Sequence, residues 1–338
     1  MRACPPRLGS LVVPFALVAA LASAQTPVPA SSRSAGGVMA LALSSGTVYA
    51  GTAAGGLYVS SDRGESWRQA EGSLAGLFVA ALAIDPAVPE VVYAGTNGAG
   101  VFRSADGGRK WTEASSGLAN LFVEALAIDP VAPARVYAAT DGGVFRTEDG
   151  GRSWTDLREG LADPAVTSLV LEPGSGALYA GTKGSGVFRL DRGATKWAAS
   201  GVPSRAPVKG LAVLGSTPAT VFAATGAGLF RTSNAGEAWA SASPTLAGFS
   251  ILVLGVDPSS SSRLYACAVG GLFRSNNGGA EWASVDTGSP DLLFSAIAFD
   301  RAAGGAVYLG AEGTVVRSDN GRTWKAIKLP PPAGEEEE

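Results

Sequence analysis

The acidic side chains are the groups of this sequence with the widest scope for chemistry. The 338 residues include 29 aspartates and glutamates but no histidine. Without histidine, the chain cannot form a Ser-His-Asp or Cys-His catalytic arrangement or a histidine-ligated zinc site. Two carboxylates that face each other across a cleft can still hydrolyse a glycosidic bond. The acids that serve no repeated structural feature include Glu71, Glu113, Glu124, Asp141, Glu159, Asp163, Asp291 and Glu312.

A repeated unit must position these acids, and the tryptophans mark that unit. All seven tryptophans recur at steps of 42 to 44 residues. A fixed period in this range indicates a repeat architecture. The tryptophans are Trp67, Trp111, Trp154, Trp197, Trp239, Trp282 and Trp324.

Each repeat contains four short segments. An apolar run such as residues 79–84 ends at Asp85-Pro86, and residues 92–96 and 100–104 follow before the segment that begins at the tryptophan. Four short strands separated by turns predict an antiparallel meander sheet. The first strand is apolar on both faces, so it is expected between neighbouring sheets.

We therefore predict an all-β fold, a seven-bladed β-propeller with four antiparallel strands per blade, over residues 37–329. A helical repeat is excluded because no window spaces its apolar residues three and four apart, and because glycines interrupt every unit. The first repeat begins with its inner strand and the last ends with its outer strand. We therefore expect no strand exchange between the first and last blades, and closure of the ring by packing of blade faces alone.

A recurring phrase precedes each tryptophan. In the first blade it is Ser60-x-Asp62-x-Gly64-x-x-Trp67, and most later blades repeat it with Asp or Asn. Its chemistry is structural. The Asp or Asn oxygen accepts hydrogen bonds from backbone amides just ahead, glycine supplies a positive φ, and tryptophan packs as a large apolar plate.

Two blades depart from the phrase. Blade four has Leu190, Arg192 and Ala194 in place of Ser, Asp and Gly, so we expect a turn that is built differently. Blade seven, residues 317–321, lacks the leading hydroxyl when its phrase is counted back from the tryptophan.

This phrase resembles the Asp-box, or BNR, repeat. Proteins with that repeat include sialidases, xyloglucanase-type glycoside hydrolases, sortilin-type receptor domains and photosystem assembly factors. The resemblance implies a propeller fold and is compatible with both enzymes and binding modules.

Among the possible enzymes, a sialidase is the one that the sequence disfavours most strongly. The resemblance implies that a sialidase needs an arginine trio for the substrate carboxylate and a tyrosine nucleophile with an acidic partner. In this chain the tyrosines occupy repeat positions, namely Tyr49, Tyr93, Tyr137, Tyr179, Tyr265 and Tyr308 in the second strand and Tyr58 in the third. Six arginines share one third-strand position: Arg103, Arg146, Arg189, Arg231, Arg274 and Arg317. The sialidase Arg-Ile-Pro phrase is also absent.

One position of the inner strands varies while its neighbours do not, which suggests that it faces the mouth of the central channel. It is occupied by Met39, Ala80, Glu124, Thr167, Lys209, Leu252 and Ser295. Polar residues of the loops above extend this mouth. The predicted ligand site is Glu124, Lys209, Thr167, Asn97, Asp141, Lys183 and Glu312, and a solvated channel rim is the plainer alternative.

Four phenylalanines precede inner strands: Phe78, Phe122, Phe249 and Phe294. Because they recur, a structural plug between blades is favoured over an exposed binding patch.

The N-terminal segment predicts export, and both ends of the chain are expected to lie outside the propeller. Residues 1–24 combine Arg2 and Arg7 with an apolar run and an Ala-Ser-Ala cleavage site, which is typical of a secretory signal peptide. Residues 25–36 are expected to be a flexible segment, and residues 330–338 a disordered Pro-rich acidic tail. Removal of the leader leaves Cys267 as the single cysteine, so no internal disulfide is expected.

The sequence as a whole favours an exported, non-catalytic binding or assembly module over an enzyme. We expect a monomer, periplasmic or secreted, that recognises a protein or a cell-surface glycan through one face. No cofactor, metal, nucleic acid or membrane span is expected, and the formal net charge of −3 offers no basis for binding nucleic acid. The alternative is a glycoside hydrolase, related to sialidases or xyloglucanases, that acts on polysaccharide with paired carboxylates.

Overall fold

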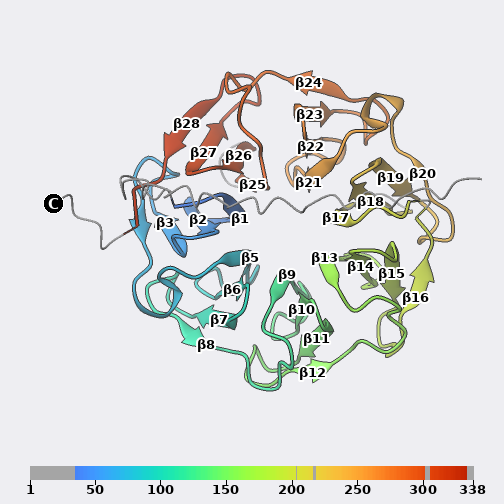
Figure 1. Ribbon diagram of the computed structural model, residues 1–338, viewed down its shortest axis with the longest axis horizontal. Helices are drawn as coiled ribbons and strands as arrows, with labels where there is room; N and C mark the ends of the chain where they lie inside the picture. Colours follow the sequence, from blue (N-terminus) through green and yellow to red (C-terminus); the bar gives the residue numbers. More distant parts are fainter. Residues whose placement is uncertain (1–34, 203, 216–217, 301–304, 333–338) are drawn as a thin grey trace, which may run out of the picture. The chain divides into compact units, whose positions relative to one another are not determined.

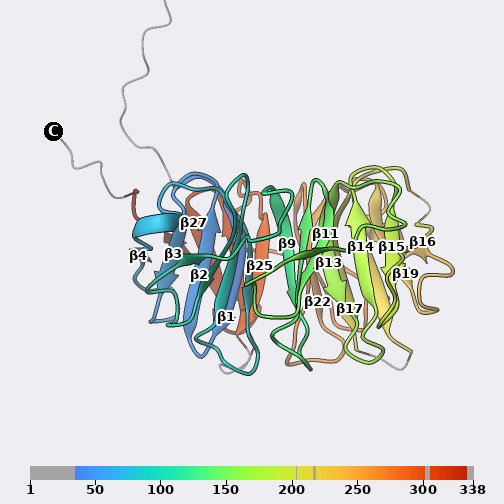
Figure 2. The same cartoon turned by 90° about the horizontal axis from the view of Figure 1, so that it is seen from below.

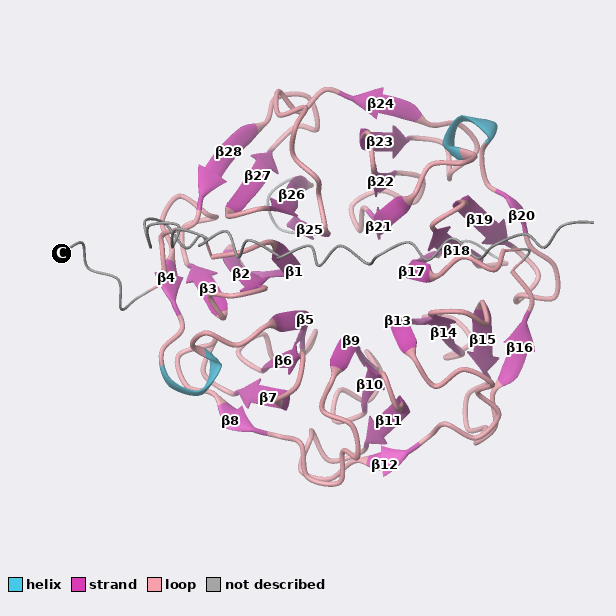
Figure 3. Cartoon of the chain, in the orientation of Figure 1, coloured by secondary structure: helices cyan, strands magenta, loops and turns pink. Residues whose placement is uncertain are grey.

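The computed structural model describes residues 35–202, 204–215, 218–300 and 305–332, which form a ring of seven antiparallel four-stranded sheets (Figure 1). Each sheet consists of four consecutive strands, with the first innermost. In the described part of the chain the only helical elements are two 3-10 turns, η1 (Gly72–Leu74) and η2 (Pro244–Leu246) (Figure 3). The prediction of an all-β, seven-bladed propeller is confirmed. The expected signal peptide lies outside the described residues.

The blades are numbered in chain order. Blades one and two are β1 (Val38–Ser44), β2 (Thr47–Thr52), β3 (Leu57–Ser60), β4 (Arg68–Gln69) and β5 (Val79–Ile84), β6 (Val92–Thr96), β7 (Gly100–Ser104), β8 (Thr112–Glu113). Blades three and four are β9 (Val123–Ile128), β10 (Val136–Thr140), β11 (Gly143–Thr147), β12 (Thr155–Asp156) and β13 (Val166–Leu171), β14 (Leu178–Thr182), β15 (Val187–Leu190), β16 (Ala198–Ser200). Blades five and six are β17 (Val208–Leu214), β18 (Thr220–Thr225), β19 (Gly228–Thr232), β20 (Ala240–Ser241) and β21 (Ile251–Val256), β22 (Leu264–Ala268), β23 (Gly271–Ser275), β24 (Ala283–Val285). Blade seven is β25 (Ala296–Asp300), β26 (Ala306–Ala311), β27 (Thr314–Ser318) and β28 (Lys325–Lys328).

The strands run between the two faces of the ring, as the side view shows (Figure 2). Each inner strand begins on one face, which also carries the turns between second and third strands and the connections between blades; we call it the entry face. The opposite face carries the turns between first and second strands and the phrases before the tryptophans; we call it the box face.

The apolar core lies between the blades. Seven buried clusters of described residues each join two neighbouring blades. In the cluster between blades one and two, Tyr49 and Leu57 pack against Val92 and Trp111. Second strands such as Val136–Thr140 are buried along their whole length, whereas outer strands such as Thr112–Glu113 are exposed. Because apolar burial is shared by neighbours, the blades depend on one another for stability.

The glycine of the second strand permits this close packing. A Cβ atom at Gly51 would lie 2.6 Å from the Val79 Cγ1 and 2.8 Å from the Val79 carbonyl oxygen, in the inner strand of the next blade. These distances are shorter than real Cβ contacts, so glycine allows the two sheets to approach.

The recurring phrase forms the expected turn. In blade one the Ser60 hydroxyl donates to the Asp62 carboxylate (2.7 Å) and accepts from the Gly64 amide (2.7 Å). The Ser66 amide donates to the same carboxylate (2.9 Å), and Gly64 has a φ of 91°. We call this turn the box.

Blade four builds this turn differently, as the sequence predicted. Leu190 is buried in the core instead of organising the turn. Asp191 forms an ion pair with Arg189 (2.6 Å), and its carbonyl accepts from the Ala194 amide (3.0 Å).

The prediction for blade seven is wrong. Ser318 supplies the leading hydroxyl, which accepts from the Gly321 amide (2.9 Å), and the Asn320 side chain accepts from the Thr323 amide (2.9 Å). The box is one residue shorter than in blade one, so counting back from the tryptophan placed Arg317 where the hydroxyl was expected.

The ring closes without strand exchange, as predicted, because β1–β4 and β25–β28 are separate sheets. The expectation that packing alone closes it is wrong. The Tyr308 hydroxyl of blade seven donates to the Arg63 carbonyl of blade one (3.2 Å), and Gly37 and Glu312 form a β-bridge. On the surface, Glu65 pairs with Lys325 (2.5 Å).

Candidate functional site

The predicted channel-mouth position coincides with a β-bulge. In six of the seven blades, the pairing of the inner strand with the second strand skips one residue. The skipped residues are Met39, Ala80, Glu124, Thr167, Lys209 and Leu252. In blade seven, Ser295 stands just before β25. A bulge leaves its extra residue without a partner in the ladder and redirects the side chain, which explains why this one position varies between repeats.

Several polar side chains of this ring bond to the next blade. Thr167 donates to the Val208 carbonyl, and Ser295 donates to the Val38 carbonyl at 2.8 Å. The Lys209 ammonium donates to the Ser250 hydroxyl at 3.1 Å. Thr167 therefore fastens blade four to blade five, a structural role that the sequence did not reveal.

Three of the predicted site residues meet between blades three and four. The Lys183 Nζ lies 2.6 Å from an Asp141 carboxylate oxygen and 3.9 Å from a Glu124 carboxylate oxygen. Glu124 stands in β9, Asp141 follows β10 and Lys183 follows β14. A third carboxylate, Asp163, accepts from the Gly184 amide at 2.8 Å beside them. We call Glu124, Asp141, Asp163 and Lys183 the acidic cluster.

The electrostatics of the cluster leave it negative. Burial raises the pKa of Glu124, an effect that Lys183 opposes and Asp141 reinforces. The hydrogen bond to Asp141 raises the pKa of Lys183, so this lysine remains charged. When all are ionised, the cluster therefore holds three carboxylates and one ammonium group, of which Asp141 and Glu124 contact the ammonium directly. The side chains of Glu124, Asp141 and Lys183 are 28%, 37% and 48% exposed, so a ligand can reach them from solvent.

An exposed apolar pair adjoins the cluster. Leu121 and Phe122, which lead into β9, are 39% and 48% exposed. The Phe122 carbonyl accepts from the Asp141 amide (3.3 Å), and Phe122 forms a β-bridge with Asn97. The backbone thus brings the predicted residue Asn97 beside the same patch.

Two of the other phenylalanines support the structural plug. Phe294 is 2% exposed, and the Phe249 ring packs edge-on against Phe273 with centroids 5.3 Å apart. Phe122 departs from this pattern because its ring is exposed.

The remaining predicted residues lie elsewhere on the entry face. Lys209 belongs to blade five, and Glu312 lies where blade seven meets blade one and pairs with Gly37. Sequence reasoning did not assign Asp163 or Leu121 to the site. Asp163 could have been found among the acids that no repeat feature explains, whereas nothing in the sequence distinguished Leu121.

The described residues contain no group of three or more His, Cys, Asp or Glu side chains arranged to hold a metal ion. Among the same residues, no helix is both long and apolar enough to cross a bilayer. Cys267 is buried, and burial raises the pKa of its thiol. This thiol is therefore a core group and not a nucleophile.

Comparison with known proteins bears on the fold. A family model described as Sortilin, neurotensin receptor 3, matches residues 55–168, about a third of the chain. No curated protein sequence matches the chain.

Solved structures with similar folds have low sequence identity to the chain. A GH74 xyloglucanase from Xanthomonas campestris is 19% identical with a TM-score of 0.72, over 87% of this chain and 54% of the enzyme. The chain thus spans about half the length of that enzyme. YCF48 from Cyanidioschyzon merolae is 16% identical (TM-score 0.65, covering 86% of this chain and 96% of that one). A structure of YCF48 bound to D1 peptide is 15% identical (TM-score 0.64, covering 83% and 92%). At these identities the likeness concerns the fold, a seven-bladed propeller of the Asp-box type.

Proposed function

We propose that this chain is a non-catalytic binding module that takes an extended polypeptide segment on its entry face, between blades three and four. The acidic cluster carries this proposal. Two of its carboxylates pair with one ammonium group and the third, Asp163, lies beside them, so the site has unbalanced negative charge that a lysine, an arginine or an amino terminus would neutralise.

The neighbouring apolar pair supplies the second part of the recognition. Leu121 and Phe122 are exposed next to Asp141 and can bury an apolar side chain of the same segment. An aromatic or aliphatic contact beside a charged one is a common composition for a small interface. The structure of YCF48 bound to D1 peptide supports the idea that a propeller of this fold can hold a peptide.

The proposal can be tested with synthetic peptide pools. Pools with a central lysine or arginine flanked by leucine or phenylalanine should bind more tightly than pools with a central glutamate, as measured by fluorescence polarisation. Asp141→Asn should weaken binding of the basic pools about tenfold, because it removes a charge-assisted contact. Glu113→Gln, which removes an exposed acid of β8, is the matched control and should bind like the wild type.

A further variant separates charge recognition from simple disruption of the site. Lys183→Met removes the ammonium group that balances Asp141 and Glu124. If the site recognises a cation, this variant should bind the basic pools more tightly than the wild type. Weaker binding by Lys183→Met, or equal binding of basic and acidic pools, would count against the proposal.

We also propose that the module works outside the cytoplasm, because residues 1–24 have the composition of a cleaved leader. Expression of the full chain in a bacterium followed by cell fractionation tests this. The processed chain should be found in the periplasmic or culture fraction and should begin at Gln25.

One observation favours a second candidate, a glycoside hydrolase. Burial raises the pKa of Glu124, as a general acid requires, and a second carboxylate, Asp141, contacts the same Lys183 ammonium group. A screen of xyloglucan and other polysaccharides for release of reducing ends decides between the two functions. Turnover that Glu124→Gln abolishes would establish the enzyme and overturn the non-catalytic proposal.

A further inference from the structure

In three blades, a tyrosine of the second strand or an arginine of the third strand bonds to the box of the next blade. In blade two, the Tyr93 hydroxyl donates to the Gly150 carbonyl of the blade-three box (3.1 Å). The Arg274 guanidinium of blade six likewise donates to the Gly321 carbonyl of the blade-seven box (2.9 Å). The tyrosine of the second strand and the arginine of the third strand thus bond backbone oxygens that the adjacent box presents.

Blade three faces the blade-four turn, which is not a box, and it lacks this contact; blade four lacks it too, since the Tyr179 hydroxyl is buried without a hydrogen-bond partner among the described residues. Within the described part of the chain, the Tyr137 hydroxyl makes no hydrogen bond, although the residue is only 8% exposed. The Arg146 Nε lies 3.1 Å from the Glu148 carboxylate, but the contact lacks hydrogen-bond geometry. Both donors face a cavity of about 200 Å³ that the altered turn leaves open.

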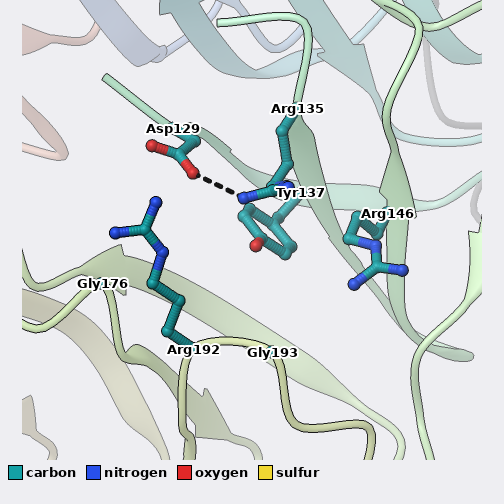
Figure 4. A pocket seen from close by; sticks show the side chains of 7 residues that line it. All are labelled: Asp129, Arg135, Tyr137, Arg146, Gly176, Arg192 and Gly193. Atoms are coloured by element: carbon teal, nitrogen blue, oxygen red, sulfur yellow. Dashed lines mark hydrogen bonds and ion pairs between the residues drawn. The ribbon is translucent and has the colours of Figure 1, made fainter. Parts of the chain in front are cut away.

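The cavity is lined by three guanidinium groups. Figure 4 shows Arg192 extending from the blade-four turn toward Asp129 and Arg135, with the Tyr137 ring between Arg135 and Arg146. We call it the blade three–four pocket. Asp129 and Arg192 belong to turns of the box face, so the pocket lies on the opposite face from the acidic cluster.

The charges of the pocket leave an excess of one positive charge. Arg135 pairs with Asp129 (3.0 Å) and with Glu148 (2.9 Å), and Glu148 also faces Arg146. Within the residues that the structure describes, Arg192 makes no ion pair or hydrogen bond. Two carboxylates therefore balance two of the three arginines.

The acids of the pocket are already engaged. One Asp129 oxygen bonds Arg135 and the other accepts from the Val131 amide (2.9 Å), so both oxygens already have partners. Burial raises the pKa of Tyr137, which keeps the hydroxyl protonated and able to donate. The free groups of the pocket are therefore donors with a net positive charge.

We propose that the blade three–four pocket is a second binding site, which takes a small tetrahedral oxyanion of the phosphate or sulfate type, free or as the terminal ester of a larger molecule. The Arg192 guanidinium offers several N–H donors to such an ion, and Arg146 and Tyr137 approach from another side. Donors from several directions suit a tetrahedral group with many acceptor positions, and guanidinium groups are the usual partners of phosphate. This site is independent of the polypeptide site on the entry face.

Binding of inorganic phosphate to the full chain tests the proposal, by isothermal titration at constant ionic strength with chloride as the balancing ion. Saturable binding is expected for the wild type. Arg192→Gln should weaken it about tenfold, since one charge-assisted bond is worth about that much. Tyr137→Phe should weaken it about threefold, since it removes one neutral donor. Arg152→Gln, which removes an exposed arginine of the blade-three box, should bind like the wild type.

Two more measurements keep the result interpretable. The thermal midpoint of each variant without phosphate shows that it folds, and added phosphate should raise the midpoint of the wild type more than that of Arg192→Gln. Titration with sulfate, glucose 6-phosphate and a sulfated monosaccharide identifies the source. Tighter binding of a sugar ester assigns an ester ligand, and equal binding assigns the free ion. Absence of saturable binding, or unchanged affinity in folded Arg192→Gln, would overturn the proposal.

Discussion

At the scale of single residues, the box carboxylates are kept ionised by the turns that they organise. Hydrogen bonds from the Ser66 side chain and amide, and from Ser60, lower the pKa of Asp62 from 3.8 to about 2. The corresponding bonds from Ser153 and Thr147 lower the pKa of Asp149. A carboxyl group whose pKa is lower in the folded state stabilises the fold above its unfolded pKa. That contribution is lost as the pH falls through the folded pKa.

Because folding lowers the pKa of Asp62, protonation of Asp62 at low pH should reduce the stability of the fold. Asp62→Asn keeps an acceptor oxygen but does not titrate, and Asn234 shows that an amide can serve, since its oxygen accepts from the Ala238 amide (3.0 Å). Between about pH 5 and about pH 2, the thermal midpoint should fall less for Asp62→Asn than for the wild type. Glu113→Gln controls for the loss of one acid. An identical acid slope in Asp62→Asn and the wild type would show that Asp62 does not carry this effect.

The site residues show how far single positions can be read from sequence. Alignment of the repeats reveals one variable position in the inner strands. In the structure this position is the extra residue of a β-bulge. The meeting of Lys183 with Asp141 and Glu124 could not be found in this way. This contact depends on the conformations of two turns in neighbouring blades. The period of the repeat does not determine those conformations.

At the scale of elements, the boxes of different blades are variants of one turn, so their backbone conformations can be compared position by position. In five of the boxes the residue before the box glycine has a positive φ. Blade one places Arg63 there (φ 62°), and blades two, three and six place Gly107, Gly150 and Gly278 there. Blade five places Ala235 there, with a φ of 56°. An L-residue in this conformation is strained by about 1 kcal/mol.

This comparison predicts a stabilising alanine-to-glycine change. Ala235→Gly should raise the free energy of unfolding by about 0.5 kcal/mol, since relief of strain exceeds the entropy that glycine adds to the unfolded chain. Ala280→Gly, in the blade-six box but without a positive φ, should lower it. Urea denaturation measures both. If both variants are destabilised alike, the backbone of the blade-five turn is not strained.

The blade-seven box shows why element boundaries resist prediction from spacing. Counted back from its tryptophan, the phrase has one residue fewer between the hydroxyl and the glycine, so the hydroxyl and acceptor roles fall on Ser318 and Asn320 while Gly321 keeps its role. The hydrogen bonds of Ser318 and Asn320 restore the correct assignment, because the turn is defined by its donors and acceptors. In blade four the same phrase is lost outright, and the blade three–four pocket is the result.

At the scale of the whole ring, the seven-fold repeat made the fold predictable, whereas the closing contacts were not. The seven clusters between blades recur because each repeat brings the same apolar residues. The seam between blades seven and one joins residues more than 240 positions apart, such as Arg63 and Tyr308. Repeats define what each blade looks like, but the seam bond of Lys325 with Glu65 depends on Glu65, a variable position of the phrase, and on Lys325, which follows the last tryptophan.

The seam predicts which contacts hold the ring closed. Tyr308 is fully buried and burial raises its pKa to about 12, so its hydroxyl remains a donor to the Arg63 carbonyl. Tyr308→Phe should lower the free energy of unfolding by about 1 kcal/mol, the usual value of one buried hydrogen bond. Glu65→Gln removes an exposed ion pair and should change it by less than about 0.5 kcal/mol.

Urea denaturation followed by tryptophan fluorescence and circular dichroism distinguishes these outcomes. Because every cluster joins two blades, both variants should unfold in one transition with the same denaturant slope as the wild type. A second transition in Tyr308→Phe would mean that blades one and seven separate before the rest of the ring unfolds. A larger loss in Glu65→Gln than in Tyr308→Phe would show instead that the surface ion pairs hold the seam, and that the buried tyrosine serves only as packing.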